Sequence, residues 1–563
     1  MKKILLMLLI ATSVFAQSNL LKMEKPKYAR GSAIDLDGST EYMSKTSPTN
    51  LDLNGTERIT ATTDRGFETN IGNWIGGGNH SVAQSSTDKK TGTYSMAMTS
   101  SAAGDGTTNY ASLPYANFTA LGQDANSIYE KYTLELWARG TGIEGSPIYT
   151  SNFSVNVDGW TQNGVANVVA GNIDGIGGQD DVLRLTSDGA NEAHGILRGS
   201  ATSGVVYKLS YSYYLPSTNT TIKKLGAYWG GNIIGTFNVE TDSWTTITIN
   251  RTVSSSSQIR FYGITSTDQN VFVGTAGDVF YIKNVILTAI VLPSVTLAIG
   301  GQSKTIANVS CVPGTFTKLV WNFQATANEV NQPIKLYLNQ ADIVYIDDVS
   351  LTKAWDLLIC SWVNFYSWNW GELFPVIVGR RETSGSLKRY NLFGRGLYNY
   401  LRASLTDGVT NVQSSASTKN VQNNDWHFAT VIFNRIDNMS FSVDLETAIN
   451  NSITSIGNMV TTVPLYIGYD PTSVFLGATV GGIMIVRFTD IAQSNVNTST
   501  LTSAYRLGIP KTWIGGSPQV VAHYKFRGTT NAQMLNDISG TGNSLTGTNV
   551  STLDKVSGSY PSR

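Results

Sequence analysis

Acidic residues and histidines are the side chains with which this sequence could hydrolyse a substrate. Hydrolysis of a glycosidic bond needs two carboxylates that face each other across the bond, about 5 to 9 Å apart. The nearest pair is Asp444 and Glu446 in the stretch SVDLE, and we expect both to be ordinary strand or hairpin residues. His427 follows an Asp-Trp pair, but the four histidines form no HExxH, and the sequence has no GxSxG, phosphate-binding loop or CxxC. The sequence therefore predicts a protein without catalytic activity.

Aromatic side chains could bind sugars, because flat apolar rings stack on pyranose faces while planar polar groups bind the hydroxyls. In GAYWGGN, Tyr228 and Trp229 stand beside glycines that would leave a ring exposed, and Trp229 is the favoured surface platform. The alternative is that aromatic residues at period two fill a core, which we expect of Trp137 and Trp321. The predicted sugar-binding residues are Tyr228, Trp229, Trp160, Trp74, Tyr366, Trp368 and Trp370.

Two of these candidates, Trp74 and Trp160, suit a core as well as a surface. Tyr366, Trp368 and Trp370 alternate in NFYSWNWGE and form a second candidate patch. Other aromatic residues available on the neighbouring predicted strands are Tyr110, Tyr115, Tyr213, Trp244 and Tyr262.

The elements that carry these residues are expected to be β-strands. With 54 Gly, 26 Tyr and 12 Trp but only 14% charged residues, the composition favours strands joined by polar turns over helices. A length of 563 residues exceeds what one hydrophobic core supports, so we expect several domains. Forty basic residues balance forty acidic ones, which argues against nucleic acid and anionic membranes as partners.

The N-terminus has the pattern of a secretory signal peptide. Two lysines precede the apolar run ILLMLLIATSVF, and residues 14–16 (VFA) fit a cleavage site. Because a run of about 12 residues is too short to span roughly 30 Å of hydrocarbon, we expect residues 1–16 to be removed and the mature protein to be secreted or surface-associated, without membrane insertion. Cys311 and Cys360 are too few for a disulfide scaffold. We expect Cys360 to be a core residue, and whether the two pair is left open.

One motif occurs twice in close succession. YIDDVSL at 345–351 is nearly repeated as YIKNVIL at 281–287. The strands before each copy match in order and alternation, except that the counterpart of VYKLSYSYYL (206–215) is KYTLELWARG (131–140), on the far side of the first set. The first strands of both predicted sandwiches therefore come before the last strands of either. This order predicts that one sandwich is inserted into a loop of a related one.

The two openings support the same interpretation. Phe67 precedes Trp74 by seven residues, and Phe153 precedes Trp160 by seven. Either half of the interrupted unit alone would be an implausibly small sandwich with open edges. The predicted units are an outer sandwich at 61–145 plus 292–354 and an inner sandwich at 146–291.

A third level of nesting surrounds both sandwiches. The flanking predicted strands are SAIDLDGSTEYMS (32–44), WDLLICSWVNF (355–365), NDWHFATVIFN (424–434), PLYIGYDP (464–471) and GGIMIVRFTDIAQS (481–494). In this order they resemble the laminin-G-like, concanavalin A-like jelly roll, which implies a host domain at 31–60 plus 355–510 and an all-β fold class of nested sandwiches. Retaining enzymes of the related laminarinase type carry Glu-x-Asp-x-(x)-Glu on one strand, and the stretch SVDLE lacks the first Glu.

The two inserted sandwiches resemble family 4/9 carbohydrate-binding modules, which open on Gly-Phe-Glu followed by Trp and close on Ile-Asp-Asp-Val-Ser-Leu. The outer sandwich carries both ends of that pattern. The inner sandwich departs from it, because Ser154 stands in place of Glu68 and Lys283-Asn284 stand in place of the two aspartates. The resemblance therefore implies a module that binds glycans in the outer sandwich and a more distant relative in the inner one.

In the resembled modules a structural calcium joins the opening and closing strands, and calcium takes oxygen ligands from carboxylates and loop carbonyls. By position the resemblance implicates Glu68, Asp348 and the segment around Thr91 and Thr93. The alternative is a set of solvated turn acids with no ion. Asn284 predicts that the inner sandwich lacks the site. Apart from calcium, no cofactor is expected.

The C-terminal tail at 511–563 contains NDISGTGN (536–543), which resembles the segment that opens many such jelly rolls. It would add a strand either to the host or to a neighbouring molecule through an exposed edge. Two functions fit the whole sequence. The favoured one is an exported, lectin-like or adhesive multi-module protein that binds glycans or polysaccharides. The alternative is a structural or decoration subunit of an extracellular assembly or virus particle with little sugar binding, in which the tail would support self-association.

Overall fold

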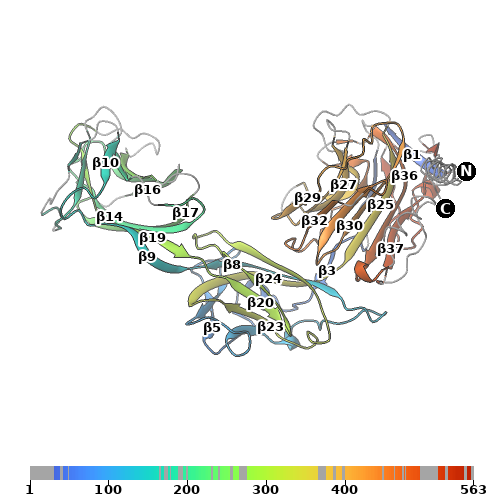
Figure 1. Cartoon of the computed structure of the whole chain (residues 1–563), viewed down its shortest axis with the longest axis horizontal. Coiled ribbons are helices and arrows are strands. Elements are labelled where there is room, and N and C mark those ends of the chain that lie inside the picture. The colour runs from blue at the N-terminus through green and yellow to red at the C-terminus, as the bar shows by residue number, and fades with distance from the viewer. Residues whose placement is uncertain are drawn as a thin grey trace, which may run out of the picture.

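The computed structural model gathers β-strands into three lobes arranged in a row (Figure 1). The all-β class predicted from the sequence is confirmed, since the described helices, such as α2 (Thr63–Gly66) and α4 (Asn531–Met534), are single turns. Within the described residues, no helix has the length and apolarity needed to cross a membrane. The described residues are 31–37, 42–48, 50–163, 167–169, 175–177, 179–187, 194–197, 201–229, 232–238, 241–253, 258–264, 275–365, 376–383, 388–395, 400–446, 449–461, 463–471, 474–475, 477–494, 516, 518–526, 530–548, 550 and 555–558.

The host lobe packs two antiparallel sheets around one apolar core. In the described part, the first sheet contains, in spatial order, β32 (Ile449–Ser452), β31 (Asn438–Val443), β30 (Trp426–Phe433), β25 (Asp356–Asn364), β36 (Gly477–Phe488), β1 (Gly31–Asp37) and β39 (Lys555–Gly558), with β37 (Pro518–Tyr524) also beside β36. The second contains β29 (Asn411–Gln413), β28 (Tyr400–Thr406), β27 (Arg389–Arg395), β26 (Val376–Arg381), β33 (Leu465–Ile467), β2 (Tyr42–Lys45) and β38 (Thr546–Thr548). A short pair, β34 (Tyr469–Asp470) and β35 (Val474–Phe475), lies apart from these sheets.

The C-terminal tail pairs with the host of its own chain. β37, β38 and β39 lie beside β36, β2 and β1. Asp537 lies in the segment between β37 and β38 and ties its two ends together. Its carboxylate accepts hydrogen bonds from the backbone N–H groups of His523 at 2.9 Å and Asn543 at 3.0 Å. Of the two placements left open for the tail, the described strands therefore adopt the one within the host.

The outer sandwich is built from segments on both sides of the inner one. Its larger sheet has the order β22 (Thr317–Gln324), β8 (Lys131–Gly140), β24 (Asp342–Ala354), β6 (Ser95–Ser100) and β5 (His80–Ser85), with β3 (Asn54–Glu57) beside β24. Its smaller sheet has the order β21 (Gln302–Ile306), β20 (Val295–Ile299), β23 (Ile334–Leu338), β7 (Tyr110–Leu113) and β4 (Ile75–Gly77).

The inner sandwich has the same strand order. Its larger sheet is β17 (Trp244–Thr252), β14 (Val206–Tyr214), β19 (Val279–Val291), β12 (Leu183–Thr186) and β11 (Asn167–Val169), with β9 (Ile143–Ser151) beside β19. Its smaller sheet is β16 (Asn232–Asn238), β15 (Lys224–Trp229), β18 (Ile259–Ile264), β13 (His194–Leu197) and β10 (Trp160–Asn163). β24 therefore corresponds to β19, β8 to β14 and β22 to β17.

The local backbone repeats as well. Phe67 and Phe153 both adopt positive φ, at 58° and 59°, and so do Asp348 and Asn284, at 49° and 50°. Positive φ is costly for most side chains and least so for Asn and Asp. Each motif also contains an irregularity in strand register, in β24 against β8 and in β19 against β14. The two sandwiches therefore share their positions of positive φ as well as their sequence pattern.

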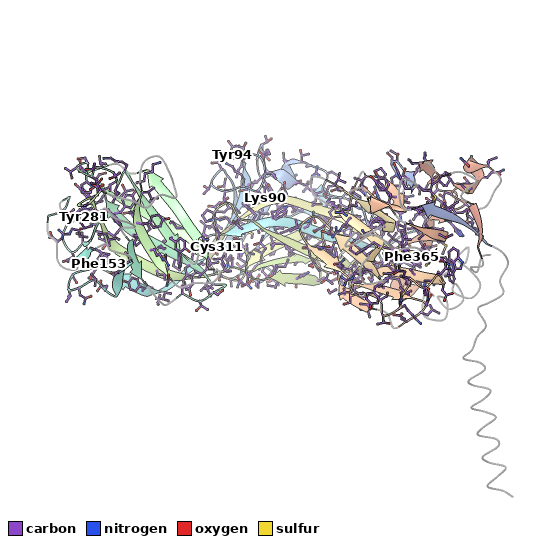
Figure 2. The ribbon with its side chains drawn as sticks, turned by 90° about the horizontal axis from the view of Figure 1, so that it is seen from above. Lys90, Tyr94, Phe153, Tyr281, Cys311 and Phe365 are labelled. Carbon is purple, nitrogen blue, oxygen red and sulfur yellow. The ribbon has the colours of Figure 1, made fainter. Side chains whose placement is uncertain are left out.

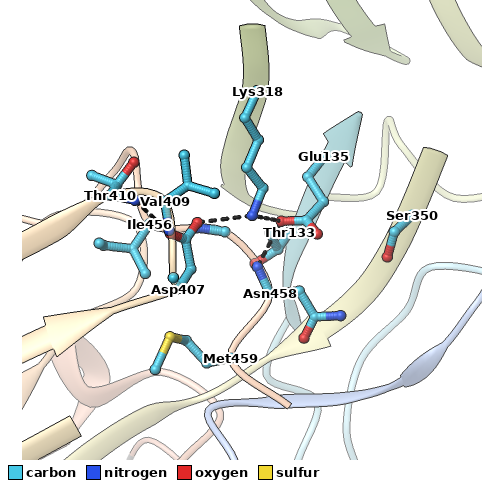
Figure 3. Close-up of polar contacts among 12 residues, drawn as sticks. Thr133, Glu135, Lys318, Ser350, Asp407, Val409, Thr410, Ile456, Asn458 and Met459 are labelled. Carbon is cyan, nitrogen blue, oxygen red and sulfur yellow. Dashed lines mark hydrogen bonds and ion pairs between the residues drawn. The ribbon is translucent and has the colours of Figure 1, made fainter. Parts of the chain in front are cut away.

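The host and the outer sandwich share a buried polar interface (Figure 3). Lys318 of β22 bridges Glu135 of β8, at 3.1 Å, and Asp407 of the host, at 2.9 Å. The backbone N–H of Asn458 also donates to Glu135, at 2.7 Å. The outward face of the larger sheet is thus partly occupied by host loops in the half nearer the host.

The outer and inner sandwiches meet in an equivalent way. Asn322 of β22 donates to the host carbonyl of Ile456 at 2.9 Å, and by strand register its counterpart in β17 is Asn250, which donates to the carbonyl of Cys311 at 3.3 Å. Cys311 packs with Val206 in a small apolar cluster between the two lobes (Figure 2). The same sheet position therefore serves both junctions.

Candidate functional site

The three tryptophans predicted as candidates in the sandwiches are core residues. Trp229 is 0% exposed, Trp160 2% and Trp74 3%. Trp229 packs in the inner core against Tyr207, and Trp160 stacks on Phe261 at 5.1 Å. The prediction that Trp229 forms a surface platform is wrong, because alternation along β15 turns it inward. Trp160 and Trp74 lack the exposed ring face that a sugar needs.

Tyr228 points the other way from Trp229. It is half-buried on the outward side of the smaller inner sheet, where the Arg260 guanidinium lies 5.1 Å from its ring centre. The stretch with Tyr366, Trp368 and Trp370 lies outside the described residues. Of the predicted sugar-binding side chains that are described, Tyr228 is thus the one that keeps an exposed part.

A row of aromatic rings crosses the larger inner sheet. Strand register places Tyr281 of β19, Tyr214 of β14 and Trp244 of β17 side by side. The Tyr214 ring centre lies 5.5 Å from that of Trp244 and 6.1 Å from that of Tyr281. All three alternate with core residues, so they lie on the outward side of the sheet. Tyr214 and Trp244 are half-buried there, whereas Tyr281 is 9% exposed. We call Tyr281, Tyr214 and Trp244 the inner aromatic row; Tyr281 lies in the lobe farthest from the host (Figure 2).

A tight turn and a lysine border the row. The Trp244 indole N–H donates to the carbonyl of Ile176 at 3.0 Å. Gly177 lies against the rings with φ 54°, and a Cβ there would meet the Tyr214 ring at 2.7 Å, so only glycine fits. Lys283 lies 4.7 Å from the Trp244 ring centre, and burial lowers its pKa.

Polar side chains continue the same face toward the outer sandwich. The hydroxyls of Ser212 and Thr246 lie 2.8 Å apart, and those of Ser210 and Thr248 lie 3.3 Å apart, on the paired strands β14 and β17. Thr246 and Thr248 are exposed. The face therefore offers ring surfaces at one end and hydroxyl groups along its length, which is the mixture that sugar hydroxyls and ring carbons can contact.

The outer sandwich carries a different arrangement at the equivalent position. Trp137 of β8 is half-buried on the outward face instead of in the core, which corrects our expectation, and the ammonium of Lys90 covers its ring at 4.3 Å. Trp321 does lie in the core, 5% exposed. Arg139 forms an ion pair with Asp88 and lies 5.6 Å from the Tyr345 ring centre. Charged side chains therefore lie over both rings of this face.

The four residues predicted as calcium ligands come together in the outer sandwich. The Thr91 hydroxyl donates to Asp348 at 3.0 Å, and the Thr93 N–H donates to Glu68 at 2.8 Å. Two carboxylates and a hydroxyl suit calcium, which prefers oxygen ligands, although here the carboxylates accept protein hydrogen bonds. No cluster of three His, Cys, Asp or Glu suited to a metal occurs within the described residues.

Asp347 lies beside this cluster and is 0% exposed. Its carboxylate accepts hydrogen bonds from the N–H groups of Lys90 at 2.9 Å and Thr91 at 3.1 Å. Burial raises the pKa of Asp347 to about 6, with a further contribution from the charge of Asp348. Burial also raises the pKa of Asp348. These carboxylates are therefore held in a setting that disfavours their charge when no cation is near.

The residues considered for catalysis have other partners. Asp444 and Leu445 form the turn after β31, with φ of 50° and 63°. The Asp444 carboxylate lies 2.7 Å from His427 Nδ1, and Glu446 accepts the Thr418 hydroxyl at 2.7 Å. Asp444 and Glu446 are hairpin residues, as expected.

A cleft of about 650 Å³ opens at the edge of the outer sandwich beside Ile436 of the host. Trp321 and Phe323 form part of its wall. Its polar groups already have partners within the chain: the Gln324 amide donates to the carbonyl of Tyr129 at 3.0 Å and to Asp490 of the host at 3.1 Å, and Glu329 accepts the Thr326 hydroxyl at 2.6 Å. A cluster of half-buried tyrosines, Tyr42, Tyr466 and Tyr469, lies on the host.

Comparison with known proteins gives structural likeness alone. No protein-family model matches the chain, and no curated protein matches it. A Bacteroides ovatus protein whose proposed role is carbohydrate binding shares 10% identity over 65% of this chain and 90% of its own, with a TM-score of 0.25. The CBM22 tandem domain of Xyn10C from Paenibacillus barcinonensis shares 10% identity over 38% of this chain and 98% of its own, with a TM-score of 0.22.

Domains LG4-5 of the mouse laminin α1 chain share 10% identity over 58% of this chain and 92% of their own, with a TM-score of 0.18. The laminin domains are of the kind that the sequence resemblance named for the host, whereas the CBM22 modules are carbohydrate-binding modules of a family other than the one named for the inserted sandwiches. Their TM-scores are too low to assign a function, which therefore rests on the residues of this chain.

Proposed function

We propose that this chain is an exported, non-catalytic protein of several modules that binds glycans. The observation that carries the proposal is the inner aromatic row, in which Tyr281, Tyr214 and Trp244 stand side by side on an outward sheet face. Aromatic rings bind pyranoses through their apolar faces. The partly exposed rings of Tyr214 and Trp244 lie on neighbouring strands and can contact more than one sugar unit, whereas a single ring contacts one.

The surroundings of the row support this use. The turn at Gly177 and the hydrogen bond from Trp244 to Ile176 hold the indole in one position, which lowers the conformational entropy lost on binding. Ser212 and Thr246 bring hydroxyl groups next to the rings. The inner sandwich is also the lobe farthest from the host (Figure 1).

Calcium is proposed as a structural ion of the outer sandwich. Glu68 and Asp348 would hold it with the help of Thr91, and its charge would offset the cost of keeping Asp347 and Asp348 ionised. The ion would tie the opening strand of this sandwich to its closing strand. Signal cleavage after residue 16 is part of the same proposal of export.

A structural or decoration subunit of an extracellular assembly or virus particle is the second candidate. The buried polar interface between host and outer sandwich favours it, because Lys318, Glu135 and Asp407 fix the two lobes together as a spacer would require. Self-association through the tail would need strand edges other than those used by β37, β38 and β39 within the chain.

The experiment is a glycan and polysaccharide array probed with residues 17–563, in calcium and in chelator. We expect binding to a defined class of glycan, lowered about five- to thirtyfold by Trp244→Ala, since loss of one stacked ring removes about 1–2 kcal/mol. Tyr228→Ala, on the opposite sheet, is the matched control and should leave binding unchanged. A blank array from folded protein would instead favour the structural candidate.

A further inference from the structure

We infer that the glycan bound by the inner aromatic row is acidic and carries carboxylate or sulfate groups. This inference rests on the proposed function and adds the class of ligand. It starts from two cations, Arg184 and Lys283, that project from the same sheet face as the row. Arg184 of β12 is the direct cross-strand neighbour of Tyr281, and Lys283 follows Tyr281 by two residues on β19.

Neither cation has a carboxylate partner among the described residues. Lys283 donates to the neutral amide of Gln179, and burial alone accounts for the lowering of its pKa. Arg184 Nε is buried without a hydrogen-bond partner in the described part of the chain. Half-buried cations without counter-charges are unfavourable, so an anionic ligand would gain from pairing with both.

Three nearby charged groups form no ion pair with these cations in the described part of the chain: Lys208, Asp242 and Asp180, whose carboxylate accepts the Gly175 N–H at 3.1 Å. Lys208 of β14 is already paired with Glu144 of β9. Asp242 accepts the Ser217 N–H at 2.9 Å and lies 3.4 Å from the Tyr214 hydroxyl, on the side of the row away from Arg184, because Tyr214 and Tyr281 stand between them in the strand order.

The outer sandwich provides an internal comparison. By register, Lys283 occupies the position of Asp347, so the charge there is reversed between the two sandwiches. In the outer sandwich the cations have acidic neighbours: Arg139 pairs with Asp88, and Lys90 interacts with Asp348. The unpaired positive charge is therefore a property of the inner face and not of the repeated fold.

The geometry suits an acidic polysaccharide better than a small anion. The aromatic row supplies ring faces for the sugars, while Arg184 and Lys283 border it on the β12 and β19 side. An arginine fork can bind a carboxylate or sulfate through two hydrogen bonds. The two kinds of acidic group share this chemistry, and matched probes separate them.

The test is titration of residues 17–563 with polygalacturonate and its carboxyl-reduced form, and with dextran sulfate and dextran. Lys283→Met and Arg184→Met keep the apolar bulk and remove the charge. Each should lower affinity for the preferred acidic probe about tenfold or more, as for loss of a charge-assisted hydrogen bond, and added salt should weaken binding. Lys208→Met is the control and should change affinity less than threefold. Circular dichroism establishes that the variants fold.

The outcomes separate this inference from the proposed function. Equal binding of the neutral and acidic forms, with Trp244→Ala still lowering it, would overturn the acidic class and keep glycan binding. Equal losses in Lys283→Met and Lys208→Met would indicate unspecific attraction and would also overturn it. Absence of binding to all four probes and to the array would overturn both.

Discussion

Lys131 of the outer sandwich and Asp356 of the host form an ion pair at 2.6 Å, with both side chains 0% exposed. Lys131 also pairs with Asp490 at 2.9 Å. Asp356 accepts the N–H groups of Arg435 at 2.9 Å and Ile491 at 2.8 Å. One carboxylate therefore joins two host loops to the inserted sandwich at the point where the chain returns to the host.

Removing the ammonium should strongly destabilise the protein. Lys131→Met leaves Asp356 and Asp490 buried without their cation, and burial already raises the pKa of Asp356 despite Lys131. The expected loss is about 3–5 kcal/mol in the free energy of unfolding, measured by chemical denaturation. Lys208→Met breaks the exposed pair with Glu144 and should cost about 1 kcal/mol or less. Equal losses in the two variants would contradict the account of this interface.

Substitution of Trp229 should mainly lower stability, whereas substitution of Trp244 should mainly lower glycan affinity. Trp229→Ala empties a fully buried site and should cost about 3–5 kcal/mol of stability, seen as a lower midpoint of thermal unfolding. Trp244→Ala removes a half-exposed ring and should lower glycan affinity with a smaller change in stability. A folded, stable Trp229→Ala protein that has lost binding would place the sugar site elsewhere.

Calcium should stabilise the outer sandwich in a pH-dependent manner. The folded pKa of Asp347, about 6, exceeds the ordinary value of 3.8, so this group's own stabilisation is present below about pH 4 and is lost as pH rises through about 6. A cation beside ionised Asp347 and Asp348 would offset that loss. We expect calcium to raise the thermal midpoint near pH 7.5 and to do so less near pH 5.

Glu68→Gln removes a proposed calcium ligand and should abolish the rise in thermal midpoint that calcium causes. Asp242→Asn removes an exposed acid of the inner sandwich and should leave it intact. If all three proteins gain equally from calcium, the ion acts somewhere other than at Glu68 and Asp348.

Both cysteines should be unreactive in the folded protein. Cys311 and Cys360 are buried and unpaired, and burial raises the pKa of Cys311 to about 12 and that of Cys360 still further. Because the thiolate is the reactive form, a thiol reagent should label neither in the native state and both in denaturant without reductant. Absence of labelling in denaturant would reveal a disulfide.

The sequence predicts the all-β fold class and the opening and closing motifs of the two inserted sandwiches. It does not predict which face of a sheet each aromatic residue occupies. In GAYWGGN, the alternation of inward and outward side chains allows either Tyr228 or Trp229 to face the core. The register of β15 against β16 also shifts between Ala227 and Tyr228, inside this stretch. Packing with Tyr207 and the rest of the inner core turns Trp229 inward. The sequence of this stretch alone does not contain that information.

The inner aromatic row was harder still to predict. The sequence predicts Trp244 as an available aromatic residue but does not single out Tyr214 and Tyr281, because their importance depends on cross-strand register. The shift between Ser210 and Ser212 sets that register. One signal was present in the sequence: Lys283 replaces an aspartate of the repeated motif, and the reversal of charge marks the face on which Tyr281 lies.

The most direct test of the central claim is oxidative footprinting of the folded chain with and without the glycan that the array selects. Mass spectrometry would read the oxidation of individual side chains. Protection of Tyr214 and Trp244, with Tyr228 oxidised equally in both samples, is the result we predict. Protection confined to Tyr228 or to the host tyrosines Tyr42 and Tyr466, with the inner aromatic row unchanged, would contradict it.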